Sequence, residues 1–208
     1  MEVNWAADHL QVIRTLMERS ALYRRALAPI MLTCGTIGIA AATITCFVKI
    51  DEPAEFAGFW LGVSVIAFLI SFLLVRRQAL KDAEPFWSPP TRRVSRALLP
   101  PFVIGLTAAI VFLVFRELDS GAAWFLGVLW TCVYGCALHA AGFFMPRGIR
   151  LFAWAFVAGG CGALLAGLFR PALQTPEAAH YLMGIFFGAL HLAYGVYLYF
   201  TEKSRNAA

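Results

Sequence analysis

Charged residues are scarce in this sequence, and their scarcity restricts the kinds of protein that it can form. Aspartate, glutamate, lysine and arginine make up 14% of the 208 residues, whereas 61% are hydrophobic. An ordinary soluble domain has about 25% charged and about 45–50% apolar residues. A water-soluble globule could not bury so much apolar surface. The composition and the mean hydropathy of +0.73 therefore indicate an integral membrane protein.

The apolar runs contain no Asp, Glu, Lys or Arg in their central parts. Ion-coupled pumps usually place such residues inside the membrane as proton relays or counter-ions. The sequence also has no Gly-Lys-Ser/Thr phosphate loop, no His-Glu-x-x-His helix and no convincing Ser–His–Asp set. These absences disfavour proton-driven transport and the commonest hydrolase and nucleotide-binding chemistries. We predict no catalytic residue, no cofactor and no metal site.

The five cysteines provide no disulfide framework, because all of them fall inside apolar runs. We interpret them as small packing residues. Cys132 and Cys136 are four residues apart and close to His139, a pattern that could hold a soft metal ion. A lone Cys-x-x-x-Cys inside a span is weak evidence for a metal site, so helix packing is the preferred interpretation.

Six apolar runs of spanning length follow one another along the chain. About 20 helical residues cross the roughly 30 Å hydrocarbon core of a bilayer. The runs that meet this length, and that together make up a transmembrane domain at 27–200, are 27–48, 57–75, 99–115, 121–144, 151–169 and 181–200. The sequence thus predicts an all-α, polytopic membrane protein with six transmembrane helices in three hairpins and a cytoplasmic tail at 201–208.

The basic residues are biased toward one side of these predicted spans. With six spans, fourteen of the seventeen lysines and arginines lie on one side, whereas the twelve acidic residues divide evenly between the two sides. Because loops rich in Lys and Arg stay in the cytoplasm, this bias predicts that both termini are cytoplasmic. The basic residues also cluster beside apolar helices, so the net charge of +5 does not lead us to expect nucleic-acid binding.

An amphipathic pattern occupies the segment before the first span, residues 1–26. On a helical wheel Leu10 and Ile13 belong to the apolar face, whereas Asp8 and Arg14 belong to the polar face. This pattern predicts an N-terminal amphipathic interfacial helix that lies on the cytoplasmic membrane surface or against a cytoplasmic protein partner.

The longest connection between spans, at 76–98, is both basic and aromatic. It reads RRQALKDAEPFWSPPTRRVSRAL and contains Trp87, Arg92, Arg93 and Arg96. Tryptophan prefers the membrane–water interface, and basic residues are attracted to anionic lipid headgroups. We therefore predict that this connection is a solvated linker anchored at the interface, with membrane lipids and their anionic headgroups as its partners.

Small residues recur at every fourth position in two predicted helices, where they would allow helix backbones to approach closely. They are Ala155, Gly159, Ala163 and Gly167 in the fifth span, and Cys34, Gly38 and Ala42 in the first. We expect these positions to pack helices of the same chain against each other. Packing between chains in an oligomer is the alternative.

An ionisable residue, His191, lies near the middle of the last predicted span. It is eleven residues from His180, or about 16 Å along an α-helix, and this spacing would put both rings on nearly the same helix face. A residue of this kind inside a membrane is a candidate functional residue, although neutral imidazole is far cheaper to bury than a carboxylate. A structural, hydrogen-bonded histidine and a functional one are both compatible with the sequence. Tyr134 and Tyr194 are its candidate polar partners, while His139 lies at a different depth, which disfavours a haem held by two histidines.

Two of the predicted hairpins begin with similar segments, RALAP at 25–29 and RALLP at 96–100. In both we expect the proline, Pro29 or Pro100, in the first turn of a helix, where its missing N–H costs nothing. The similarity suggests a repeated hairpin, although short matches between apolar segments also arise by chance.

Three short motifs carry a resemblance to known proteins: MERS at 17–20, VYG at 133–135 and FGALHLAYG at 187–195. With them the chain resembles a family of small bacterial six-helix inner-membrane proteins that has no known activity. The resemblance implies the same topology and a location in the bacterial inner (cytoplasmic) membrane, and it implies no catalytic residue.

Three functions are compatible with these observations. The first is a non-enzymatic membrane module that senses or scaffolds through its amphipathic helix and basic loops. The alternative is a carrier or channel for a small neutral or apolar solute, with His191, Tyr194 and Tyr134 lining the path. The third is a membrane-embedded enzyme or redox protein, for which the sequence offers the least support.

Overall fold

The computed structural model describes residues 21–83, 85–115, 118–145 and 148–207. This part of the chain is all-helical, and it contains six helical segments long and apolar enough to cross a membrane. The predicted fold class, an all-α protein with six candidate spans, is therefore confirmed. The predicted amphipathic helix within 1–26 falls almost entirely outside the described residues.

The first five candidate spans are single α-helices, and the sixth is composite. Their bounds are α2 Ala21–Thr45, α3 Pro53–Lys81, α4 Pro89–Val114, α5 Ala122–Ala141 and α6 Gly148–Phe169. The sixth consists of α7 (Pro176–Met183), the π-helix η2 (Gly184–Leu190) and α8 (His191–Ala207). A short 3₁₀ turn, η1 (Pro171–Leu173), connects α6 to α7.

Two helices extend far beyond the apolar runs that predicted them. α3 has 29 residues and α4 has 26, whereas the runs were placed at 57–75 and 99–115. The runs ended where charged residues begin, but Lys and Arg are good helix formers and do not interrupt the backbone hydrogen bonds. The helices therefore continue beyond the apolar part and carry basic residues on their last and first turns.

The prolines at 29 and 100 do not occupy the first helical turns, contrary to the prediction. Pro29 lies inside α2, and Pro100 and Pro101 lie inside α4, because both helices begin earlier than expected. The first turns of α3 and α4 hold other prolines, Pro53 and Pro89. A proline inside a helix removes one backbone hydrogen bond, which membrane helices tolerate when nearby groups satisfy the freed carbonyl.

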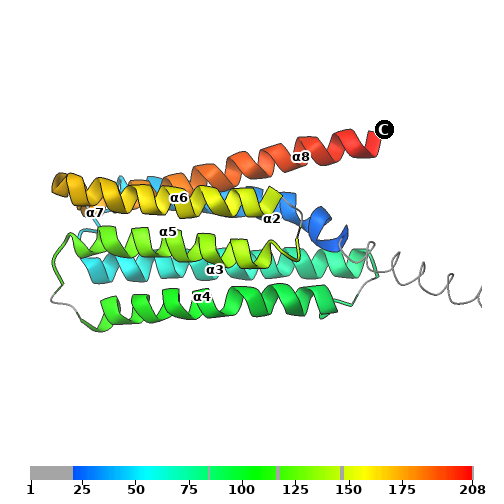
Figure 1. Ribbon diagram of the computed structural model, residues 1–208, viewed down its shortest axis with the longest axis horizontal. Helices are drawn as coiled ribbons and strands as arrows, with labels where there is room; N and C mark the ends of the chain where they lie inside the picture. Colours follow the sequence, from blue (N-terminus) through cyan, green and yellow to red (C-terminus); the bar gives the residue numbers. More distant parts are fainter. Residues whose placement is uncertain (1–20, 84, 116–117, 146–147, 208) are drawn as a thin grey trace, which may run out of the picture.

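The helices form a bundle in which neighbours in sequence pack side by side (Figure 1). α3 packs against α2 and α4, and α5 packs against α4, α6 and α7. The last span returns to the first, since η2 and α8 pack along α2. The beginning of α2 and the end of α8 therefore lie at the same end of the bundle, together with the α3–α4 and α5–α6 connections (Figure 1).

Burial is distributed unevenly among these helices. Half of the most apolar stretch of α5 is buried inside the bundle, compared with 6% for α3 and for α4. α5 is thus the central helix, while α3 and α4 present most of their apolar side chains outward. In water such a surface would be unfavourable, whereas hydrocarbon is a suitable solvent for it.

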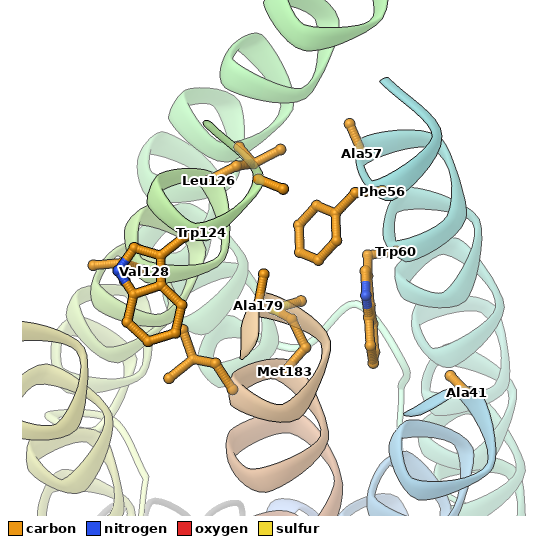
Figure 2. Close-up of a cluster of buried hydrophobic side chains, with 11 residues drawn as sticks. Ala41, Phe56, Ala57, Trp60, Trp124, Leu126, Val128, Ala179 and Met183 are labelled. Atoms are coloured by element: carbon orange, nitrogen blue, oxygen red, sulfur yellow. The ribbon is translucent and has the colours of Figure 1, made fainter. Parts of the chain in front are cut away.

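Two clusters of buried side chains make up most of the core. Figure 2 shows the first, in which Phe56 and Trp60 from α3 face Ala179 and Met183 from α7, with Trp124 contributed by α5. The second cluster joins α2, α5 and α6 and includes Met31, Leu138, Ile149, Phe152 and Phe156. It surrounds the part of the last span where the π-helix ends.

Candidate functional site

The π-helical segment η2 is the local feature that precedes His191. Its sequence, GIFFGAL, contains two glycines that face α2. An added Cβ on Gly184 would lie 2.7 Å from the Ala42 Cβ atom. An added Cβ on Gly188 would lie 2.8 Å from the Ile39 nitrogen. A π-helix bonds residue i to i+5, so regular α-helical pairing is interrupted where it begins and ends. Such segments are frequent at functional sites, so the residues around η2 are candidate functional residues.

His191 is the first residue after the π-helix, and only 2% of its surface is exposed. Its Nδ1 atom lies 3.0 Å from the carbonyl oxygen of Phe186, and its Nε2 atom lies 2.9 Å from the hydroxyl oxygen of Tyr134. A carbonyl oxygen can only accept a hydrogen bond, so Nδ1 carries the proton and donates a hydrogen bond to the Phe186 carbonyl. Nε2 of the neutral ring is then the acceptor, and the Tyr134 hydroxyl donates to it.

Aromatic rings enclose the His191 imidazole. Phe152 and Phe156 of α6 meet it nearly edge-on, with centroids 5.1 and 5.4 Å away, and Phe187 stacks at 6.1 Å. The Tyr134 ring is 5.5 Å away. An apolar enclosure of this kind strongly disfavours a charged imidazolium, so the site holds a neutral histidine with both nitrogens hydrogen-bonded.

The three residues expected at an intramembrane polar site are only partly brought together. Tyr134 and His191 are hydrogen-bonded across α5 and α8. Tyr194 instead stacks on Phe152, with a centroid distance of 4.5 Å and an interplanar angle of 16°. Its hydroxyl lies against Gly148, where an added Cβ would be 2.6 Å away. Tyr194 therefore adjoins the site through Phe152 rather than through a hydrogen bond.

A second buried histidine site, at His180, was not predicted from the sequence. The indole N–H of Trp60 donates to Nδ1 of His180 at 2.9 Å, and Nε2 of His180 donates to the Ile50 carbonyl at 3.1 Å. This neutral ring is the opposite tautomer to that of His191. Trp60 is the feature of the sequence that could have indicated the His180 site, because an indole N–H buried in an apolar span requires an acceptor.

The two histidines do not share a site, although their spacing suggested a common helix face. His180 bonds to α3 and to the α2–α3 connection, whereas His191 bonds to α5 and to its own span. The π-helix lies between them. Its turns contain more residues than α-helical turns, which changes the angular relation between positions eleven residues apart.

One buried polar atom of the described residues has no hydrogen-bond partner, the Nε1 nitrogen of Trp124. Gly167 of α6 lies against it, since an added Cβ there would be 2.6 Å from the nitrogen. In Figure 2 the nitrogen points away from Phe56 and Trp60. The other buried side-chain nitrogens and oxygens in the described part of the chain are paired.

The small residues expected at helix seams mostly contact other helices of the same chain. An added Cβ on Gly38 would lie 2.7 Å from the Gly188 nitrogen, and Gly159 meets the Phe186 ring. Ala163 packs against the first core cluster, together with Ala42. Cys34 faces α3, where its sulfur is 3.3 Å from the Ser71 hydroxyl. Ala155 differs from the expectation, because its side chain is exposed.

The cysteine pattern on α5 does not converge with the nearby histidine. His139 makes edge-on ring contacts with Phe143 and Trp154, at centroid distances of 5.4 and 5.6 Å. The described residues contain no group of three His, Cys, Asp or Glu side chains placed to hold a metal ion. Cys132 lies instead against Gly160 of α6, where an added Cβ would be 2.5 Å from its sulfur.

The basic and aromatic residues of the α3–α4 connection lie on the surface. Arg92, Arg93 and Arg96 are exposed, and Trp87 is 59% exposed. They stand at the end of the bundle that also holds the beginning of α2 and the end of α8 (Figure 1).

Comparison with protein-family models, with curated proteins and with solved structures finds no match for this chain.

Proposed function

We propose that this chain is a non-enzymatic membrane module that senses or scaffolds at the cytoplasmic face of a bacterial inner membrane, with both termini in the cytoplasm. The observation that carries the proposal is the state of His191. Both nitrogens of this ring are hydrogen-bonded to Phe186 and Tyr134 of the same chain. No lone pair or N–H of the ring is left for a solute, a metal ion or a transferred proton.

The orientation rests on the placement of the basic side chains. Arg76, Arg77, Arg92 and Arg93 are exposed at the end of the bundle that holds the beginning of α2 and the end of α8. Basic loops are retained on the cytoplasmic side during insertion, which supports cytoplasmic termini. The resemblance to bacterial inner-membrane proteins in the FGALHLAYG motif supports the choice of membrane.

The competing function is a carrier or channel for a small neutral or apolar solute along the face that contains His191 and Tyr134. Such a protein must break the Tyr134–His191 hydrogen bond, or rearrange around it, for each solute that passes. Osmotic swelling of proteoliposomes in glycerol or urea tests this directly. The module predicts permeability equal to that of empty vesicles. Permeability above that level which falls in Tyr134→Phe would favour the carrier.

A second experiment tests whether the N-terminal segment binds a cytoplasmic protein partner. If it engages a cytoplasmic partner, then Leu10→Asp should abolish co-purification of that protein from cross-linked cells, because a carboxylate on the apolar face opposes burial. Thr15→Asp places the same charge on the polar face of the predicted helix and is the matched control. Equal retention of the partner by both variants would contradict docking through the apolar face, and equal loss would indicate a nonspecific charge effect.

A further inference from the structure

We propose that the end of α3 and the beginning of α4 form a binding site for the headgroup of an anionic phospholipid. This proposal goes beyond the sensing or scaffolding function and does not depend on it. The site consists of exposed cations from two adjacent helices, an aromatic residue between them and an apolar surface that leads into the membrane-spanning part.

The cations are concentrated in a short part of the structure. All of them are exposed, and they belong to the end of α3 or to the beginning of α4. They are Arg76, Arg77, Lys81, Arg92, Arg93 and Arg96. Several exposed cations at one location attract an anion, and arginine in particular binds phosphate through two parallel N–H donors.

Burial of neighbouring residues directs the cations outward. Ala79 of α3 is 1% exposed, and Thr91 and Val94 of α4 are 4% and 6% exposed, so these positions mark the inward faces. Val94 packs with Ala141 of α5 in a small buried cluster. The arginines at 92, 93 and 96 occupy the remaining faces of the same helical turns. The outward direction is thus imposed by the helix rather than by a mobile loop.

Aromatic contacts hold the connection between the two helices. Phe86 packs edge-on against Phe72 of α3, with a centroid distance of 5.1 Å, and Trp87 stacks on Phe86 at 6.4 Å. Ser88 and Thr91, both buried, are hydrogen-bonded at 3.0 Å in the first turn of α4. These contacts place a half-exposed indole beside the cations, and indole rings prefer the headgroup level of a bilayer.

An apolar surface continues from the cations along both helices. Leu73 and Leu80 of α3 are 57% and 73% exposed, and Leu99 and Val103 of α4 are 62% and 52% exposed. A ligand that lies against both regions needs a negative headgroup joined to hydrocarbon. An acidic protein would match the cations but not this apolar surface, so an anionic phospholipid is the occupant that fits both.

Native mass spectrometry of the detergent-solubilised full chain, titrated with phosphatidylglycerol or phosphatidylcholine, tests the proposal. We expect the wild type to bind phosphatidylglycerol more tightly than phosphatidylcholine. The double variant Arg92→Gln/Arg93→Gln should weaken phosphatidylglycerol binding by roughly thirtyfold, because the attraction of each cation to an anionic headgroup contributes about 1 kcal/mol. Phosphatidylcholine binding should not change, because its headgroup has no net charge.

The matched control removes two exposed cations from the opposite end of the bundle, Lys49→Gln/Arg170→Gln. This variant has the same net charge as the first and should bind phosphatidylglycerol like the wild type. Equal weakening in both double variants would overturn the proposal, as would equal binding of the two lipids by the wild type. Binding of soluble polyglutamate without preference for phosphatidylglycerol would assign the cations to an acidic protein instead.

Discussion

At the scale of single residues, the two buried histidines differ in the nitrogen that carries the proton. Nδ1 of His191 donates to a carbonyl, whereas Nδ1 of His180 accepts from the Trp60 indole. Each tautomer is determined by one partner that can act in only one way, a carbonyl or an indole N–H. Hydrogen bonding of this kind makes a neutral imidazole tolerable inside an apolar bundle, since both of its polar atoms are satisfied.

The His191 tautomer can be observed by nitrogen NMR of histidine-labelled protein in micelles. We expect a protonated Nδ1 and an unprotonated, hydrogen-bonded Nε2 for His191, and the reverse assignment for His180. Tyr134→Phe should shift the Nε2 resonance of His191 and lower the free energy of unfolding by about 1 kcal/mol, as expected for a lost intramembrane hydrogen bond. Tyr194→Phe, the control, removes a hydroxyl that does not bond to His191 and should leave that resonance unchanged. A protonated Nε2 on His191 in the wild type would contradict the assignment.

The sequence indicates which residues are candidates for the site more readily than it indicates which residues contact each other. His191 stands out because it is polar in an apolar run, and Tyr134 is a natural candidate partner for the same reason. Their hydrogen bond joins positions 57 apart in the chain, and the Trp60–His180 bond joins positions 120 apart. No local pattern encodes such pairings, because they depend on which helices become neighbours and on their rotation about their axes.

At the scale of helices, the seam between α2 and the last span is built on glycine. An added Cβ on Gly35 would lie 2.7 Å from the Leu192 Cα atom, and one on Gly195 would lie 2.7 Å from the Leu32 nitrogen. The atoms approached are backbone atoms, which cannot move aside as a flexible side chain can. Close backbone packing of this kind provides dispersion contacts between helices, which have no hydrophobic driving force within lipid.

This geometry predicts that glycine positions differ sharply in their tolerance of alanine. Gly38→Ala brings a methyl group against the backbone of Phe187 and Gly188, and we expect it to lower the free energy of unfolding by about 2 kcal/mol. Gly62→Ala is the matched control, because nothing lies within 4 Å of an added Cβ there. Unfolding in detergent, followed by circular dichroism, measures the difference. Similar stability of the two variants would show that the α2 seam is not tightly packed.

The composite last span shows why helix type is harder to predict than helix existence. The segment GIFFGAL is apolar and contains no proline, so it reads as continuous α-helix, yet residues 184–190 are π-helical. The two glycines face α2, and this packing involves residues more than 140 positions earlier in the chain. Hydropathy, in contrast, is a local property, which explains why the six spans could be counted from the sequence while their ends at Lys81 and Pro89 could not be located.

At the scale of the whole molecule, the two ends of the bundle carry different charges. One end exposes the arginines of α3 and α4, whereas the other exposes Lys49 and Arg170 as well as the acidic residues Asp51 and Glu52. An asymmetry of this kind has a direct consequence during insertion, because Lys-rich and Arg-rich segments are retained on the cytoplasmic side. It also supplies a test of topology that needs no knowledge of the function.

Single cysteines at the two ends should be labelled from opposite sides of the membrane. In a variant with the five native cysteines replaced by alanine, Glu52→Cys and Arg92→Cys each place a thiol at an exposed position. A membrane-impermeant maleimide should label Glu52→Cys in intact spheroplasts, and it should label Arg92→Cys only after the membrane is permeabilised. Equal labelling of both in detergent controls for reactivity, and the cysteine-free parent controls for background. Labelling of both in intact spheroplasts would contradict a transmembrane arrangement, and the reverse pattern would place both termini outside.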